Sequence, residues 1–137
     1  MRTAEVLKLI EQFSQTYRNS DLEKFEIGEK YVLYPKEGEE TEFSWPNQWQ
    51  FCGDSGIYLF IDENDEVIYI GETTHFGNRF GSYFSSKIEN LLKHNWNSNP
   101  HFVIPIKVPT ESSFERLGLE EYLIKKTNPI DNKRFNN

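Results

Sequence analysis

The stretch that most constrains this chain runs from Gly56 to Gly71 and reads GIYLFIDENDEVIYIG. It contains two apolar runs, residues 57–61 and 67–70, that are rich in the β-branched and aromatic residues favoured in strands. The polar cluster Asp-Glu-Asn-Asp at residues 62–65 separates the two runs and is typical of a turn. This pattern predicts a β-hairpin, to which the rest of the domain must supply partners.

The register of the hairpin depends on its loop. A two-residue loop at residues 63–64 places Tyr58 directly opposite Tyr69, with their Cβ atoms roughly 5 Å apart on one face of the sheet. A loop at residues 64–65 would slip the register and separate the two tyrosines. The first register, in which Gly56 also faces Gly71, is the one we expect.

Length and composition indicate a folded single domain. A chain of 137 residues is the size of one domain, and its 11 Phe, 7 Tyr and 3 Trp are more than a disordered chain carries. Because Cys52 is the only cysteine, a disulfide framework and a cysteine-based zinc site are excluded. No apolar segment approaches membrane-spanning length, and the first residues lack the apolar core of a signal peptide. We expect a soluble cytoplasmic protein without a membrane partner; composition does not indicate its oligomeric state.

The net charge of −7 counts against nucleic-acid binding, since contacts to phosphate dominate such affinity. The charge is unevenly distributed along the chain, however. Residues 73–137 contain 9 basic and 6 acidic side chains, a net of +3. The carboxy-terminal half is therefore able to present a mildly basic face.

The residues before the hairpin form an extension of mixed character. Residues 3–18 place apolar side chains at helical spacing, which predicts an amphipathic helix. Residues 20–23 resemble a capping box and predict a short second helix, and residues 31–34 predict a strand. Four aromatic residues closer to the hairpin have two readings, packing in the core or a platform for unstacked bases: Phe43, Trp45, Trp49 and Phe51.

The residues after the hairpin predict three helices and one strand. Thr74 is placed to cap the first helix, and serines that begin capping boxes precede the other two. Pro105 makes the strand an edge or bulged strand, and Asn128, which precedes a proline, leaves the last helix. In order, these elements are a helix at 75–84, a helix from Ser86 to Trp96, a strand at 102–108 and a helix from Ser112 through Ile124.

Two charged residues stand out beside the tyrosines. Arg79 lies ten residues beyond Tyr69, in the first helix after the hairpin. Glu120 lies on the last helix with apolar residues three before it and four after it, so its carboxylate faces the edge of the core. Such a position is costly unless a metal or a cation compensates. A structural ion pair with Arg79, or with Arg116 one turn earlier, is the plainer reading.

Four motifs occur in a fixed order. The triads GIY at 56–58 and YIG at 69–71 are followed by NRFGSYF at 78–84, EEYLI at 120–124 and PIDN at 129–132. Together they resemble the GIY-YIG nuclease superfamily, whose signature the two triads reproduce. The arginine that precedes a Tyr-Phe pair is similar to the amino-terminal nuclease domain of the bacterial excision-repair incision subunit. The last two motifs match the family patterns Glu-x-x-Leu-Ile and Pro-x-x-Asn.

The resemblance implies an α/β (α+β) fold with a small three-stranded antiparallel sheet flanked by helices. The hairpin and the strand at 102–108 would form that sheet. A single domain, residues 1–137, would then consist of an N-terminal extension, 1–55, and a nuclease-like core, 56–132. The implied activity is a metal-dependent endonuclease that hydrolyses phosphodiester bonds in DNA with Mg²⁺ or Mn²⁺.

The resemblance also implies roles for individual residues. Glu120 would be the metal ligand, because a hard cation prefers oxygen ligands and keeps several waters. Arg79 would stabilise charge on the phosphate in the transition state. Tyr58 or Tyr69 would activate or orient the attacking water, and the sequence leaves open which one does so. The residues expected to border the substrate are Gly71, Tyr83 and Asn132.

One position departs from the family pattern. In several members a lysine follows the YIG glycine or lies near it, whereas here that position is Glu72. A carboxylate there repels phosphate and raises the pKa of a neighbouring phenol. Glu72 could instead be an extra metal ligand or turn away into solvent.

Two alternatives to an active nuclease follow from these features. The chain could keep the nuclease fold as a module that binds nucleic acid or a partner with little or no catalytic activity, which Glu72 and the acidic surface favour. It could also be a nuclease effector that binds a protein partner through residues 1–50. DNA is the expected partner if the chain is an active nuclease.

Overall fold

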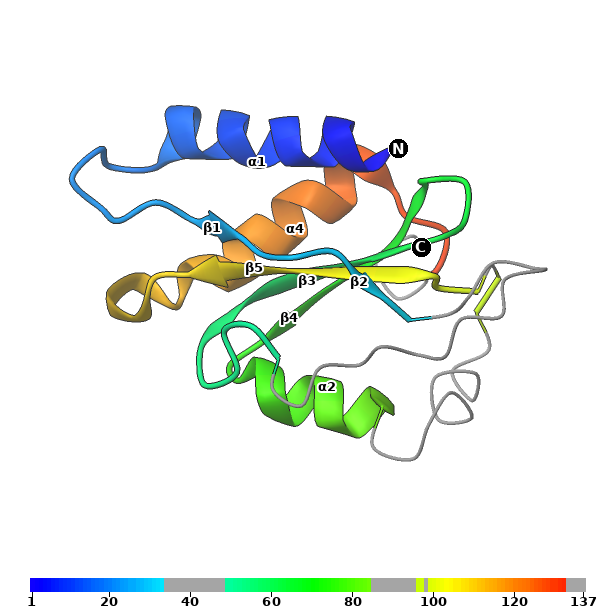
Figure 1. Cartoon of the computed structure of the whole chain (residues 1–137). Coiled ribbons are helices and arrows are strands. Elements are labelled where there is room, and N and C mark those ends of the chain that lie inside the picture. Colours follow the sequence, from blue (N-terminus) through cyan, green and yellow to red (C-terminus); the bar gives the residue numbers. More distant parts are fainter. Residues whose placement is uncertain (34–48, 85–95, 98, 133–137) are drawn as a thin grey trace.

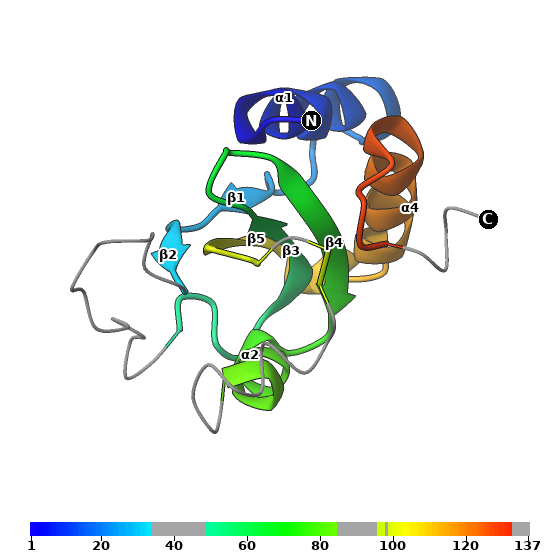
Figure 2. The same ribbon diagram turned by 90° about the vertical axis from the view of Figure 1, so that its right-hand side faces the viewer.

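The computed structural model describes residues 1–33, 49–84, 96–97 and 99–132, and its centre is an antiparallel sheet (Figure 1). The three longest strands are β3 (Ser55–Ile61), β4 (Val67–Thr73) and β5 (Phe102–Val108), with β3 in the middle. These are the three strands that the sequence predicts. Helices α1 and α4 cover one face of the sheet and α2 covers the other (Figures 1 and 2).

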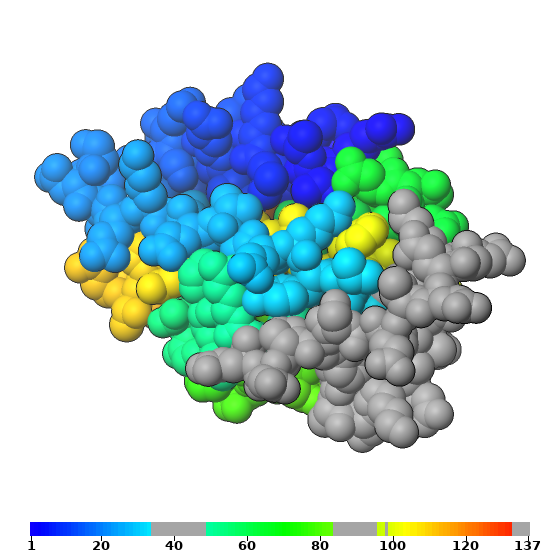
Figure 3. Space-filling view, viewed as in Figure 1, coloured from blue at the N-terminus to red at the C-terminus, as the bar shows by residue number. Residues whose placement is uncertain are grey.

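Two short strands extend the sheet beyond the predicted three. β1 (Glu26–Ile27) and β2 (Tyr31–Val32) both pair antiparallel with β5, on the side away from β3. Only the second of them was expected, because two residues are too few to show a periodic pattern. Together with α1, they run across one side of the molecule (Figure 3).

The break between β1 and β2 accommodates Pro105. This residue lies inside β5, which pairs with strands on both of its sides. The sequence predicts an edge or bulged strand here, and β5 is not an edge strand. Its carbonyl oxygen accepts a hydrogen bond of 2.8 Å from the backbone N–H of Gly28. Since the N–H and C=O of one residue in an antiparallel strand point to the same neighbour, the missing N–H of Pro105 faces the gap at residues 28–30.

Helix α1 (Thr3–Tyr17) contributes to the main core, as its amphipathic pattern predicts. Val6 and Ile10 are buried in the same cluster as residues of the sheet and of α4 (Glu115–Thr127). Burying two such side chains contributes roughly 3–6 kcal/mol in all. The N-terminal extension is thus an integral layer of the fold. Other buried members of this cluster are Ile57, Leu59, Ile70, Leu119 and Leu123.

Helix α2 (Phe76–Phe84) covers the opposite face through a second, aromatic core. Trp49 meets Phe80 edge-on with ring centroids 4.8 Å apart, and Phe51 packs 6.4 Å from Phe76. Trp49 and Phe51 therefore pack in the core, which is the simpler of the two predictions made from the sequence. The other two aromatic residues of that group, Phe43 and Trp45, lie outside the described residues, as does the helix predicted from Ser86.

Three helix starts differ from those predicted. Residues 20–23 form a turn and no helix, because the side chain of Asn19 accepts a hydrogen bond from the N–H of Asp21. His75 caps α2 in place of Thr74, since its Nδ1 accepts a hydrogen bond of 3.0 Å from the N–H of Asn78. A 3₁₀ turn at Thr110–Ser112 precedes α4, which begins at Glu115 without a side-chain cap.

The end of α4 agrees with the prediction. Asn128 has φ 48° and ends the helix in the left-handed conformation, which asparagine tolerates better than most residues. None of the helices among the described residues is long and apolar enough to cross a membrane.

The hairpin forms, but its register differs from the predicted one. Tyr58 pairs with Gly71 and Phe60 pairs with Tyr69, so the two tyrosines are diagonal neighbours. They still share one face of the sheet, with ring centroids 6.2 Å apart. Gly56 faces Thr73.

Two irregularities of one residue each produce this slip. The loop has three residues, 63–65, because Asp62 donates its N–H to the carbonyl of Glu66, and Asp65 adopts φ 66°. A bulge at Ile68 then shifts the pairing once more. A slip of one residue would have moved Tyr69 to the opposite face, whereas two slips return it to the face of Tyr58.

Candidate active site

Several of the predicted site residues lie on the edge strand β4 or on the helices on either side of it. Tyr69 and Gly71 lie on β4 itself, which runs between α2 and α4 at the margin of the sheet (Figure 2). Arg79 comes from α2 on one face, and Glu120 comes from α4 on the other. Three elements that are distant in sequence therefore contribute to one margin of the molecule.

Gly71 is in contact with the ring of Tyr58. A Cβ atom built at residue 71 would collide with three atoms of that ring, Cζ, Cε2 and the hydroxyl oxygen. The hydroxyl of Tyr58 is also 3.1 Å from the hydroxyl of Tyr83 on α2. The glycine of the second triad thus leaves the space that the tyrosine of the first triad fills.

The environment of Tyr58 and Tyr83 keeps both phenols protonated. Tyr58 is only 1% exposed, and burial, followed by the charges of Tyr83 and Tyr69, raises its pKa far above the ordinary value. Burial likewise raises the pKa of Tyr83 to about 12. In both cases the positive charge of Arg79 opposes the shift in pKa, which places the guanidinium near the two phenols. Tyr69 is less buried than either of them.

A polar hollow of about 250 Å³ surrounds Arg79. The sequence predicted only the arginine, although its neighbours recur at the i, i+3, i+4 and i+7 spacing of one helix face. His75 anchors the start of that face, since the N–H of Arg79 donates to its carbonyl. Arginine, imidazole, amide and hydroxyl groups all donate hydrogen bonds, so the hollow suits an anion. Its lining consists of Thr73, Thr74, His75, Asn78, Arg79 and Ser82.

Glu120 is buried, with 6% of its surface exposed, between α4 and the sheet. Its neighbour Leu119 and the following Leu123 fill the core and fix that face of the helix. Carboxylate oxygens are ligands that Mg²⁺ and Mn²⁺ prefer. Within the described ranges no group of three or more His, Cys, Asp or Glu side chains gathers to hold a metal.

Glu72 has a defined partner. Its Oε2 accepts a hydrogen bond of 2.9 Å from Nε of Arg116, which lies one turn before Glu120 on α4. The carboxylate that follows the YIG glycine is thus neutralised and directed toward α4. The sequence could not show this, because the two residues are 44 positions apart.

Asn132 forms a pair of hydrogen bonds with the edge of β4. Its Oδ1 accepts from the N–H of Ile70 at 2.9 Å, and its Nδ2 donates to the carbonyl of Ile70 at 2.8 Å. The buried amide therefore pairs with both backbone groups of Ile70, as a neighbouring strand would, between Tyr69 and Gly71. This contact supports a positioning role; its predicted place beside the substrate stays a prediction.

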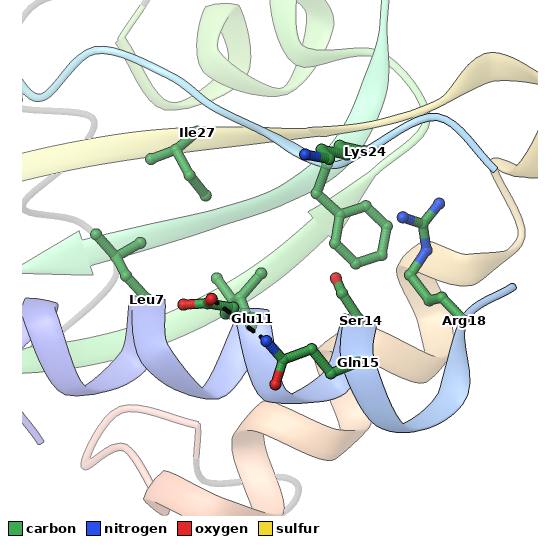
Figure 4. Close-up of a pocket in the computed structure, with 9 residues that line it drawn as sticks. Leu7, Glu11, Ser14, Gln15, Arg18, Lys24 and Ile27 are labelled. Atoms are coloured by element: carbon green, nitrogen blue, oxygen red, sulfur yellow. Dashed lines mark hydrogen bonds between the residues drawn. The ribbon is translucent and has the colours of Figure 1, made fainter. Parts of the chain in front are cut away.

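A larger hollow, about 450 Å³, lies between α1 and β1 and contains none of the predicted site residues (Figure 4). Leu7 and Ile27 line it from the two elements. At its end, Arg18 covers the ring of Phe25 at 4.0 Å and donates two hydrogen bonds to Glu115. We find no chemistry in this hollow that belongs to the site at β4.

Comparison with known proteins identifies a family for this chain. The family model described as the GIY-YIG catalytic domain matches residues 54–136. UvrABC system protein C from Dictyoglomus thermophilum is 38% identical over 85 residues, which cover 60% of this chain and 13% of that protein. The same protein from Rickettsia prowazekii is 39% identical over 75 residues, which cover 55% of this chain and 12% of that protein. The chain thus corresponds to a small part of these relatives.

Solved structures of the GIY-YIG N-terminal endonuclease domain of UvrC from Thermotoga maritima are also similar. The one bound to its catalytic divalent cation, magnesium, is 29% identical, covering 58% of this chain and 84% of that chain with a TM-score of 0.44. A tyrosine-to-phenylalanine mutant of the same domain is 27% identical, covering 58% and 83% with a TM-score of 0.43.

Proposed function

The chain belongs to the GIY-YIG nuclease superfamily, and from this premise we propose that it is a metal-dependent endonuclease that hydrolyses phosphodiester bonds in DNA. One observation carries the proposal. Tyr58, Gly71 and Tyr83 pack together at the edge of β4, with Arg79 on one side of the sheet and Glu120 on the other. The two charges have the signs that a phosphate and a divalent metal require.

Glu120 would hold the metal in this proposal. The bound divalent ion supplies a Lewis acid that neutralises the scissile phosphate and stabilises the leaving oxygen. The burial of Glu120 supports the assignment. A carboxylate that is removed from water is attracted more strongly to a cation than an exposed one is. Glu72 is paired with Arg116, and we assign the metal to Glu120 by its place in the EEYLI motif.

Arg79 would bind the scissile phosphate. Its side chain is exposed within the polar hollow, and the planar guanidinium donates hydrogen bonds in a fork that matches two phosphate oxygens. Interactions of this type, aimed at charge that develops in the transition state, supply a large part of catalysis. His75 and Ser82 on the same helix face would contact the flanking backbone.

Tyr69 would orient the attacking water. Tyr58 is unsuited to this task, because only 1% of its surface is exposed. Tyr69 lies on the edge strand, is partly exposed and directly precedes the Ile70–Gly71 segment. We therefore assign the water to Tyr69 and a supporting role to the Tyr58–Tyr83 pair.

A plasmid-nicking assay with Mg²⁺ or Mn²⁺ tests the proposal. We expect Glu120→Gln and Arg79→Ala to reduce the rate by about 10²-fold or more, as the loss of a group that stabilises the transition state does. The matched control is Glu121→Gln, which changes the adjacent, exposed carboxylate that pairs with Lys125. Nicking by Glu120→Gln at the wild-type rate would contradict the site assignment.

The structure weakens one of the arguments for the alternative, an inactive binding module. That reading depended on the acidic surface and on Glu72 as an uncompensated negative charge beside the phosphate. The salt bridge to Arg116 supplies the compensation. Tight DNA binding without cleavage under either metal would restore the alternative.

A further inference from the structure

The salt bridge between Glu72 and Arg116 joins the two elements that carry the proposed site. Glu72 directly follows Gly71 on β4, and Arg116 precedes Glu120 by one helical turn on α4. The distance between Arg116 Nε and Glu72 Oε2 is 2.9 Å. The Glu72 side chain is 25% exposed and the Arg116 side chain is 17% exposed. Such a partly buried pair is screened less by salt than a surface pair.

Arg116 is held in place from both ends. Its Nη1 donates a hydrogen bond of 2.8 Å to the carbonyl of Ser113, while its Nε donates to Glu72. The bond to Ser113 fixes the guanidinium at the start of α4, so the arginine presents a preorganised donor to the strand. The strand pleat places Glu72 on the α4 face of the sheet, since its cross-strand partner Ile57 belongs to the cluster that includes α4. Arg116 neutralises the carboxylate there.

We propose that Arg116 is a positioning residue that neutralises the Glu72 carboxylate and holds it in a salt bridge, so that this carboxylate neither repels the substrate nor acts as a metal ligand. This inference rests on the proposed function. Without the arginine, an uncompensated carboxylate would remain next to Gly71 at the margin of the sheet where the proposed site lies. Like charges in contact oppose binding, and truncating one partner of a close pair leaves the other charge uncompensated.

Two other roles for the pair predict different results. If Glu72 were a second metal ligand, its loss would weaken metal binding as strongly as the loss of Glu120. If Arg116 contacted DNA directly, its loss would weaken DNA binding whether or not Glu72 were present. The proposal requires that the damage from removing Arg116 depend on Glu72.

The first arm of the test measures DNA binding in EDTA, by fluorescence anisotropy with a labelled DNA duplex. Four proteins are compared: the wild type, Arg116→Met, Glu72→Gln and the double variant. We expect Arg116→Met to bind about tenfold more weakly, as the loss of one partner of a close charge pair does. We expect Glu72→Gln and the double variant to bind within about twofold of the wild type, since neither retains an unpaired carboxylate.

The second arm measures Mn²⁺ binding without DNA, by electron paramagnetic resonance. Glu72→Gln is expected to keep the wild-type affinity within about twofold, while Glu120→Gln loses most of it. Thermal melting of every variant accompanies both arms, because a purely structural role of Arg116 would lower stability without a rescue of DNA affinity by Glu72→Gln. If Arg116→Met does not fold, Arg116→Gln, which also removes the charge but keeps a hydrogen-bond donor, takes its place.

Three outcomes would overturn the inference. A double variant as weak in DNA binding as Arg116→Met would assign a direct DNA contact to the arginine. A loss of Mn²⁺ affinity in Glu72→Gln would make Glu72 a ligand. Absence of DNA binding by the wild type would remove this inference and the proposed function together, whereas binding without cleavage would remove the proposed function alone.

Discussion

Tyr58 lies directly across from Gly71 in the paired strands β3 and β4, with its ring over the glycine. The two triads of the signature are therefore one packing unit. The ring of Tyr58 fits only because Gly71 has no side chain. In that position the hydroxyl of Tyr58 lies within hydrogen-bonding distance of Tyr83 on α2. This contact connects the sheet to the helix that carries Arg79.

The first prediction concerns that close approach. Gly71→Ala forces Cβ into the Tyr58 ring, and we expect a loss of about 1–3 kcal/mol in the free energy of unfolding. Nicking should fall as well, because the Tyr58 ring must move away from Tyr83. Urea denaturation measures the stability. Gly81→Ala is the matched control, since a Cβ there meets nothing within 4 Å and should stabilise α2 by up to about 1 kcal/mol.

The second prediction separates the two signature tyrosines. Tyr69→Phe should lower the single-turnover cleavage rate by about 10²–10⁴-fold, the contribution expected of a group that handles the proton of the attacking water. Tyr58→Phe removes one buried hydroxyl and should cost about 1 kcal/mol of stability with a smaller effect on the rate. The reverse order of the two rates would assign the water to Tyr58.

The third prediction concerns alkaline pH. Burial raises the pKa of Tyr83 from 10.0 to about 12, so the folded state retains this proton when the unfolded state has lost it. The contribution of Tyr83 to stability is therefore complete below pH 10 and decreases as the pH rises from about 10 through 12. Urea unfolding at a series of pH values checks this, and Tyr83→Phe should flatten the decrease. An equally steep decrease in that variant would show that other groups cause it.

The fourth prediction concerns the amide of Asn132. Asn132→Asp keeps an acceptor for the N–H of Ile70 but removes the donor to its carbonyl, which leaves two oxygens facing each other. We expect a loss of about 1–3 kcal/mol in stability, the usual cost of an unsatisfied buried group. Hydrogen exchange should also show less protection of the Ile70 amide. Asn64→Ala in the exposed loop is the control and should change neither quantity.

The fifth prediction concerns the attachment of the N-terminal extension. Arg18 and Glu115 form a pair at 2.7 Å whose side chains are 5% and 12% exposed. Burial alone would raise the pKa of Glu115, but the hydrogen bonds and charge of Arg18 outweigh it and lower that pKa. Arg18→Met should cost about 3–5 kcal/mol at neutral pH, because it leaves a carboxylate buried without its partner.

The same pair contributes to the acid dependence of stability. Because the pKa of Glu115 is lower in the folded state, its contribution is present above the ordinary carboxyl pKa and is lost as the pH falls through the folded value. Chemical denaturation of the wild type and Arg18→Met across the acid range measures this. A difference between the two proteins that stays constant with pH would contradict the assignment.

The sequence predicted the elements of the core better than their exact relation to one another. The hairpin and β5 follow from apolar runs bounded by turn residues, and α1 follows from apolar residues at helical spacing. The register does not, because the loop Asp-Glu-Asn-Asp contains no Asn-Gly or Asp-Gly pair that would fix a two-residue turn. The bulge at Ile68 has no local signal either, since both neighbours are apolar.

The site was predictable where it depends on motifs and not where it depends on long-range contacts. Tyr58, Arg79 and Glu120 could be proposed from their spacing. The pairing of Glu72 with Arg116, and of Asn132 with the Ile70 backbone, joins residues 44 and 62 positions apart. Neither pair shows a pattern in the chain, because each forms only when the sheet and α4 are assembled.

The outer side of β4 has a further consequence for how copies of this protein meet. The carbonyl of Met1, the N–H of Asp131 and the amide of Asn132 pair with the backbone of Val67, Ile68 and Ile70. An unpaired strand edge invites other chains to add strands, which leads to aggregation or domain swapping. Along residues 67–70 that route is closed. Among the described residues, strand addition is therefore left to residues 71–73 of β4 and to the short strands β1 and β2 on the opposite edge.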